Sequence, residues 1–206
     1  MGSPGVTETQ DVRLIVMDTG PLITLAVASS LDYLLYPGLP VLIPDAVLYE
    51  ATRDSDALGA QHILDWTQAH SERVQTISTE VFFNYVQSRE AMPGRREKDM
   101  GERAAIEVIH DGVRLAPGQR ALLMTEDDKV LRRVLVFETA LTAVMIPITT
   151  RDFLVGMEAA KLINSADEVY RRAEDGGRLA SQRVVLEGQH ERAREAVAQA
   201  LGRSRS

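Results

Sequence analysis

The stretch RLIVMDTGPLITLA, residues 13–26, decides the fold. Its first part belongs to VRLIVM (12–17), a short apolar run rich in β-branched residues, which is typical of a strand buried on both faces. The run ends at a single carboxylate, Asp18, and the chain then turns into a second apolar segment. The spacing of its apolar residues predicts a helix that begins near Pro21 and ends at YPG (36–38).

The same alternation continues along the chain. We expect further strands at 40–43, 73–78, 120–125 and 142–147, and helices at 44–52, 56–70, 79–90, 99–112, from 126 onward and at 151–163. Strands separated by helices predict an α/β fold in which a parallel sheet is flanked by helices, an α/β/α sandwich. The strand at 73–78 is short and fits a sheet edge.

Length and composition predict one main domain. With 206 residues and 45% hydrophobic content, the chain can bury one substantial core. We expect a flexible leader at 1–11, the domain at 12–164 and a helical C-terminal extension at 165–206. The extension has Leu, Val and Ala positions that could pack a dimer, cover the domain or bind a partner, and the sequence leaves these three open.

Several function classes are disfavoured by composition. The chain has no Cys, which excludes disulfides, thiolate metal sites and Cys nucleophiles and fits a reducing compartment. Its apolar runs are shorter than the roughly 20 residues of a membrane span, so we expect no membrane association and a cytoplasmic location. Aromatic residues make up only 5%, which argues against base-stacking platforms.

The negative charge is concentrated in the body of the chain. The net charge is -7, while residues 151–206 contain ten Arg or Lys and nine Asp or Glu, so residues 1–150 carry -8. A protein that coats nucleic acid electrostatically would show the reverse. If the ligand is a phosphodiester, a bound divalent cation is the simplest way to offset this charge.

Acidic residues follow two of the expected strands. In parallel α/β sheets, ligands bind outside the carboxyl ends of the strands. Asp18 ends the first strand and TEDD (125–128) ends the fourth; if these strands are neighbours, Asp18 and Asp127 face each other. Two ionised carboxylates so close require a proton or a cation between them. Carboxylate oxygens without His or Cys favour Mg²⁺ or Mn²⁺.

Two helical acids are placed to reach the same edge of the sheet. Glu50, in VLYEAT, follows apolar residues and can turn toward the end of the second strand. Glu102, in GERAAIEVI, is followed at i+3, i+4 and i+7 by Ala or Ile, so it lies on or beside a buried stripe. An acid on such a stripe needs a partner, and a metal ion would supply one.

Four segments in this order resemble a PIN domain, the small nuclease fold typical of toxin endonucleases in type II toxin-antitoxin pairs. They are IVMDTGPLI, VLIPDAVLYEAT, GERAAIEVI and LLMTEDDKVLRRV, and the resemblance covers residues 12–150. It implies that the metal-binding and catalytic acids are Asp18, Glu50, Glu102 and Asp127, with Asp128 as a further metal ligand. The three consecutive acids of TEDD leave open which of them coordinates, and the extension departs from the family pattern.

The resemblance also implies an activity, a cofactor and partners. The expected activity is Mg²⁺- or Mn²⁺-dependent hydrolysis of RNA phosphodiester bonds by an endoribonuclease, with an antitoxin protein as inhibitor and a homodimer as assembly. Thr19 and Thr125 match hydroxyl positions that support such sites. Arg95, Arg96 and Arg132 are expected to contact backbone phosphates without reading sequence.

Other interpretations remain for the same residues. Asp18 alone fits an N-cap, Glu50 a solvated helix acid, Glu102 a first-turn acid favoured by the helix dipole, and Asp127 or Asp128 a cap. The whole chain also fits a PIN-like module that has lost activity and serves assembly. VMDTG also resembles the motif of phosphatases of the haloacid dehalogenase type. Those enzymes require a second Asp two residues after the first, and this chain has Gly20 at that position.

Residues outside these segments are expected to be structural. The His residues are assigned to the surface and Trp66 to the core. Arg171 and Arg172 are expected to pair with nearby acids on a solvated helical face.

Overall fold

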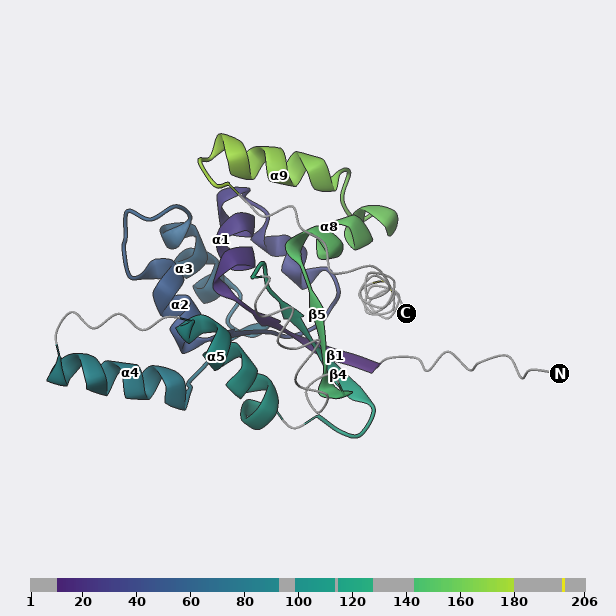
Figure 1. Cartoon of the computed structure of the whole chain (residues 1–206). Coiled ribbons are helices and arrows are strands. Elements are labelled where there is room, and N and C mark those ends of the chain that lie inside the picture. The colour runs from purple at the N-terminus through teal and green to yellow at the C-terminus, as the bar shows by residue number, and fades with distance from the viewer. Residues whose placement is uncertain (1–10, 93–98, 114, 128–142, 180–197, 199–206) are drawn as a thin grey trace.

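The computed structural model describes residues 11–92, 99–113, 115–127, 143–179 and 198 (Figure 1). In these ranges five strands form one sheet in which all neighbouring pairs are parallel, in the order β3-β2-β1-β4-β5. The strands are β1 (Asp11–Met17), β2 (Val41–Pro44), β3 (Val74–Ile77), β4 (Gln119–Met124) and β5 (Met145–Ile148). The predicted parallel sheet is confirmed, with β1 at its centre and β3 at an edge.

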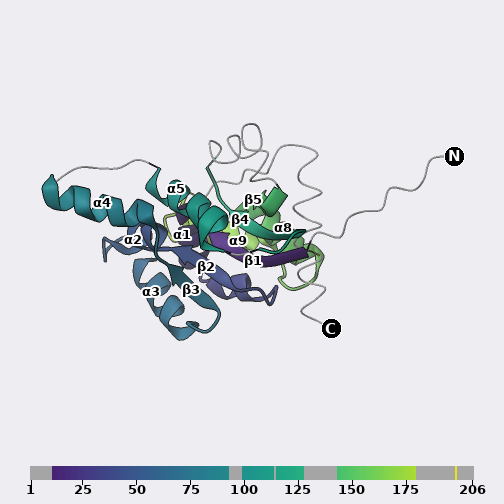
Figure 2. The ribbon, with the colours of Figure 1, turned by 90° about the horizontal axis from the view of Figure 1, so that it is seen from below.

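Helices cover both faces of the sheet (Figures 1 and 2). The described residues contain α1 (Thr19–Val27), α2 (Asp45–Thr52), α3 (Ala60–Ala69), α4 (Glu80–Ala91), α5 (Met100–Glu107), α8 (Thr150–Ala159) and α9 (Ala166–Asp175), with a 3₁₀ helix η1 (Leu31–Leu35) and a π-helical turn η2 (Val108–Gly112). Buried residues of α1, α3, α8 and α9 join one core cluster, and those of α5 and η2 join another. The α/β sandwich predicted from the sequence is therefore confirmed.

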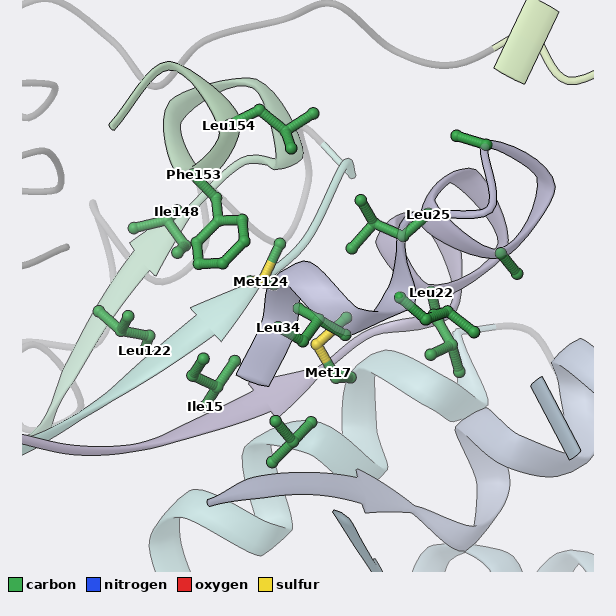
Figure 3. Packing of buried hydrophobic residues seen from close by; sticks show 14 of the residues in the cluster. Ile15, Met17, Leu22, Leu25, Leu34, Leu122, Met124, Ile148, Phe153 and Leu154 are labelled. Atoms are coloured by element: carbon green, nitrogen blue, oxygen red, sulfur yellow. The ribbon is translucent and has the colours of Figure 1, made fainter. Parts of the chain in front are cut away.

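Strand β1 is buried on both faces, as its apolar run predicts. Ile15 and Met17 point into the core under α1 and α8, where Figure 3 shows them near Leu22 and Phe153. Val16, between them, packs in the cluster on the opposite face. Burial of each such side chain stabilises the fold by about 1.5–3 kcal/mol, which fixes β1 and so the position of the residue that follows it.

Two predicted helices are interrupted. The helix expected from Pro21 to residues 36–38 ends at Val27, and the chain reverses before η1 begins. Ser29 adopts a φ of +52°, and the Ser30 hydroxyl donates a hydrogen bond of 2.9 Å to the Ala28 carbonyl. Small hydroxyl side chains compete with the helix for backbone hydrogen bonds, which explains the break.

The other break follows α8. A single helix was expected over 151–163, but α8 ends at Ala159 and Lys161 adopts a φ of +59°. The chain then enters α9 through Ser165, whose hydroxyl accepts a hydrogen bond from the Glu168 N–H at 3.3 Å. The helix expected from residue 126 and most of the leader and extension lie outside the described residues.

The structural expectations for single residues are largely confirmed. Trp66 is buried and its indole N–H donates to Asp32 Oδ1 at 2.9 Å. Arg171 pairs with acids on its own helix, α9. Arg172 instead turns toward the α1–η1 connection, where Nη2 donates to Ser30 Oγ at 3.1 Å. No helix in the described part of the chain is both long enough and apolar enough to cross a membrane.

Candidate functional site

The carboxyl ends of β1 and β4 lie side by side. Met17 and Met124 are register partners, and the Asp18 N–H donates a hydrogen bond of 3.0 Å to the Met124 carbonyl. Asp18 and Thr125 therefore leave the sheet at the same level. The predicted neighbourhood of these two strands is confirmed, and it brings the two acidic segments to one edge of the sheet.

Both oxygens of the Asp18 carboxylate accept hydrogen bonds. Oδ1 accepts one of 2.7 Å from the Thr19 N–H, which makes Asp18 the N-cap of α1. Oδ2 accepts one of 2.7 Å from the Thr125 hydroxyl. Thr125 Oγ1 in turn accepts a bond of 3.1 Å from the Asp127 N–H. The capping interpretation of Asp18 is thus correct, and the same residue is also linked to the acidic segment after β4.

The electrostatic surroundings of Asp18 are unfavourable for a charged carboxylate. Burial raises its pKa above the ordinary value of 3.8, and the hydrogen bonds from Thr125 and Thr19 lower it less than burial raises it. The negative charges of Glu50 and Asp127 raise this pKa further. The groups that act on Asp18 include these two carboxylates and no cation of the described residues.

Glu50 is half-buried and hydrogen-bonded, so it is not the solvated helix acid that a single-residue interpretation allows. Its Oε2 accepts a bond of 2.9 Å from the Thr19 hydroxyl, and its Oε1 accepts one of 3.3 Å from the Gly101 N–H. A Cβ on Gly101 would lie 2.8 Å from Glu50 Oε2 and 3.0 Å from Thr19 Oγ1. The missing side chain of Gly101 therefore lets α5 approach this carboxylate.

Glu102 lies in the same turn of α5 as Gly101 and is also half-buried. The Gly101 N–H contacts Glu50, so the first turn of α5 lies beside that carboxylate, while the acids that act on Asp18 are Glu50 and Asp127. We use the name acidic rim for Asp18, Glu50, Glu102 and Asp127. Asp128, Arg95, Arg96 and Arg132, which were also predicted as site residues, lie outside the described residues.

Glu126 differs from the acids of the rim. Its side chain is only 7% exposed, and its Oε1 accepts a bond of 2.7 Å from the Thr150 hydroxyl at the start of α8. Its Oε2 lies 3.5 Å from Arg178 Nη2. Asp127, by contrast, is exposed and acts on Asp18. Of the two described acids in TEDD, Asp127 is therefore the one that belongs to the rim.

The chemistry of the rim fits a hard divalent cation. The four carboxylate oxygens of Asp18 and Glu50 each accept one hydrogen bond from described residues, and each keeps a further lone pair. The described residues contain no group of three or more His, Cys, Asp or Glu arranged to hold a metal ion. Mg²⁺ requires no such group, because it keeps several waters and is commonly bound through one or two carboxylates.

The residues of the rim come from the end of β1, from α2 and α5, and from the segment after β4; parallel α/β sheets commonly build a site at the carboxyl ends of their strands. No protein family model, no curated protein and no solved structure matches the chain. The resemblance to PIN domains therefore depends on the four sequence segments, and the function has to be inferred from the chemistry of the rim.

Proposed function

We propose that this protein is an Mg²⁺- or Mn²⁺-dependent endoribonuclease. The observation that supports this proposal best is the convergence of Asp18, Glu50 and Asp127, in which the negative charges of Glu50 and Asp127 add to the effect of burial and raise the pKa of Asp18. A protein gains nothing in stability from such a cluster. A cluster of this kind is useful when it binds a cation that in turn binds an anionic substrate.

Each side chain of the rim has a distinct task in this proposal. Bound Mg²⁺ or Mn²⁺ would neutralise charge on the phosphate and lower the pKa of a water molecule. Asp18 and Asp127 would hold the cation, and Glu50 and Glu102 would orient a water molecule for attack on phosphorus. Thr125 and Thr19 fix the carboxylates of Asp18 and Glu50 through their hydroxyl hydrogen bonds.

The test is cleavage of single-stranded RNA by the purified chain, with and without Mn²⁺, followed by identification of the new ends. We expect cleavage only with the metal, and products with a 5'-phosphate and a 3'-hydroxyl. A 2',3'-cyclic phosphate would mean that the RNA supplies its own nucleophile, which contradicts this scheme. Arg13→Ala, at the opposite end of β1, is the matched control and should cleave like the wild type.

We further propose that this nuclease acts as a toxin held inactive by an antitoxin protein. This part rests on the resemblance alone. Expression of the chain in a bacterial host should stop growth, and Asp18→Asn should abolish the arrest. If Asp18→Asn arrests growth as strongly as the wild type, the chain acts through binding, as expected for the assembly module without activity.

A further inference from the structure

The end of α2 and the last turns of α4 carry two exposed arginines near Glu50 of the acidic rim. Arg53 follows the last residue of α2, and Arg89 lies near the end of α4; both are exposed. Figures 1 and 2 both show α4 beside α2 and α5. We use the name α2–α4 surface for Tyr49, Arg53, Tyr85 and Arg89.

The guanidinium of Arg89 is held in place by two phenols. Its Nη1 donates hydrogen bonds of 2.7 Å to Tyr49 Oη and 3.4 Å to Tyr85 Oη, and its central carbon lies 5.9 Å from the centre of the Tyr85 ring. The two rings pack with centroids 5.8 Å apart. Arg89 is therefore positioned before any ligand binds, which reduces the entropy lost on binding.

Neither arginine has a carboxylate within salt-bridge distance among the described residues. Arg13, Arg151 and Arg171, by contrast, each pair with an acid. Both charges act on the same phenol. Burial alone would raise the pKa of Tyr85, but hydrogen bonds from Tyr49 and Arg89 and the charges of Arg89 and Arg53 lower it.

The α2–α4 surface adjoins the rim through α2, which carries Glu50. Tyr49 directly precedes Glu50, and Arg53 lies about one helical turn after it. The ring that packs with Tyr49 and Tyr85 is Phe82, and Tyr85 is buried. Phe83, two residues before Tyr85 on α4, is 60% exposed and points away from Tyr85.

We propose that Arg53 and Arg89 bind backbone phosphates of a single-stranded RNA whose scissile bond lies at the acidic rim. This inference builds on the proposed function, because it names the contacts that hold the same substrate. An RNA strand near a rim of carboxylates needs nearby positive charge, and guanidinium groups form charge-assisted hydrogen bonds with phosphate.

The test is binding of a fluorescein-labelled single-stranded RNA, measured by anisotropy in EDTA so that the RNA is not cut. The proteins are the wild type, Arg53→Ala, the double variant Arg53→Ala/Arg89→Ala, and Arg13→Ala as the matched control. We expect weaker binding for Arg53→Ala and a further loss for the double variant. The slope of log affinity against log salt should fall by about 0.7 for each arginine removed, and Arg13→Ala should leave it unchanged.

The double variant loses the Arg89 hydrogen bonds, which could weaken the fold. Arg53→Ala does not have this problem, because the Arg53 side chain makes no hydrogen bond within the described residues. Affinities and salt slopes equal to those of Arg13→Ala would overturn the inference. Absence of any RNA binding by the wild type would do so as well. A change in oligomeric mass without a change in RNA affinity would identify the surface as a protein interface, and this too would overturn it.

The two proposals fail in different ways. If RNA binding depends on both arginines but the wild type with Mn²⁺ does not cut RNA, the binding surface is supported and the nuclease proposal fails. If the wild type cuts RNA and the arginine variants bind it normally, the nuclease proposal stands and this inference fails.

Discussion

Two carboxylates that leave the sheet only one strand apart lie in opposite environments. Glu126 is nearly buried, accepts a hydrogen bond from Thr150 and lies beside the cation of Arg178. Asp18 is also bonded by hydroxyl and backbone groups, but the two charges that act on it are the carboxylates of Glu50 and Asp127. An arginine balances Glu126, whereas we propose that a bound cation balances Asp18.

Glu126 and Glu50, one of the acids beside Asp18, each lie close to a glycine in the first turn of a helix. A Cβ on Gly20 in α1 would lie 3.1 Å from Glu126 Oε2 and 3.3 Å from its Cβ. A Cβ on Gly101 in α5 would lie 2.8 Å from Glu50 Oε2. The two positions form a natural pair of probes, because the same Gly→Ala change affects a structural acid in one case and a rim acid in the other.

The largest effect is expected for Asp18→Asn. It removes the charge that we propose holds the cation, so RNA cleavage with Mn²⁺ should fall by more than the roughly 10–100-fold that changes around metal ligands cost. Single-turnover cleavage rates measure this. Thr150→Val, which touches only the compensated acid, serves as the control and should keep the wild-type rate. If Asp18→Asn cleaved RNA at the wild-type rate, Asp18 would not be the cation ligand that sets it apart from Glu126.

Gly101→Ala should weaken metal binding. The new Cβ would lie 2.8 Å from Glu50 Oε2, 3.0 Å from Thr19 Oγ1 and 3.3 Å from Val47 Cγ2, so the Glu50 carboxylate and its Thr19 partner must shift. We expect Mn²⁺ affinity to fall roughly 10-fold or more, as other changes next to metal ligands do. The melting temperature should fall as well, because the β-branched Thr19 and Val47 have little freedom to move.

Gly20→Ala is the matched variant. It crowds Glu126 at its Cβ as well as at its carboxylate, so here we expect a lower melting temperature and unchanged Mn²⁺ affinity. If both variants reduce Mn²⁺ affinity equally, Glu126 belongs to the rim and the comparison between the two acids fails.

Thr150→Val should destabilise the fold by about 1.5 kcal/mol, because it leaves a nearly buried, charged carboxylate without its shortest hydrogen bond. Urea denaturation measures this change in the free energy of unfolding. An exposed pair provides the reference: Arg171→Ala, on the solvated side of α9, should change the free energy of unfolding far less. Equal effects would show that Glu126 is not held by Thr150.

The pH dependence of stability is a subtler test of the environment of Asp18. The pKa of Asp18 is raised in the folded chain, so its contribution to stability is fully present below pH 3.8 and is lost as pH rises through the folded value. In EDTA, the wild type should therefore lose stability relative to Asp18→Asn across that window, by about 1.4 kcal/mol for each unit of pKa shift. Stability that rises with pH relative to Asp18→Asn would mean that a cation of the protein already balances this carboxylate.

The parts of this structure that follow from local pattern could be predicted from the sequence. The apolar run before Asp18 specifies a doubly buried strand, and the acids at the ends of β1 and β4 identify the rim because parallel strands end at the same edge. The role of Glu126 could not be predicted, since its partners Thr150 and Arg178 are 24 and 52 residues away and only the tertiary fold brings them together.

The interruption after Val27 was missed for a related reason. Leu31 and Leu34 continue a helical spacing, so periodicity alone extends α1 through them. Both do lie in the same core cluster as α1, but they reach it from η1 after the chain has reversed at Ser29 and Ser30. Burial was therefore predicted correctly, whereas the path of the backbone depended on hydroxyl hydrogen bonds that periodicity does not record.

The most direct test of the central claim is a calorimetric titration of the metal-free chain with Mn²⁺, done in parallel on Asp18→Asn. If separate segments assemble an anionic site that a cation completes, the wild type binds Mn²⁺ and the substitution of Asp18 removes that binding while the protein remains folded. A wild type that binds no Mn²⁺, or an Asp18→Asn variant that binds it equally well, would contradict the account.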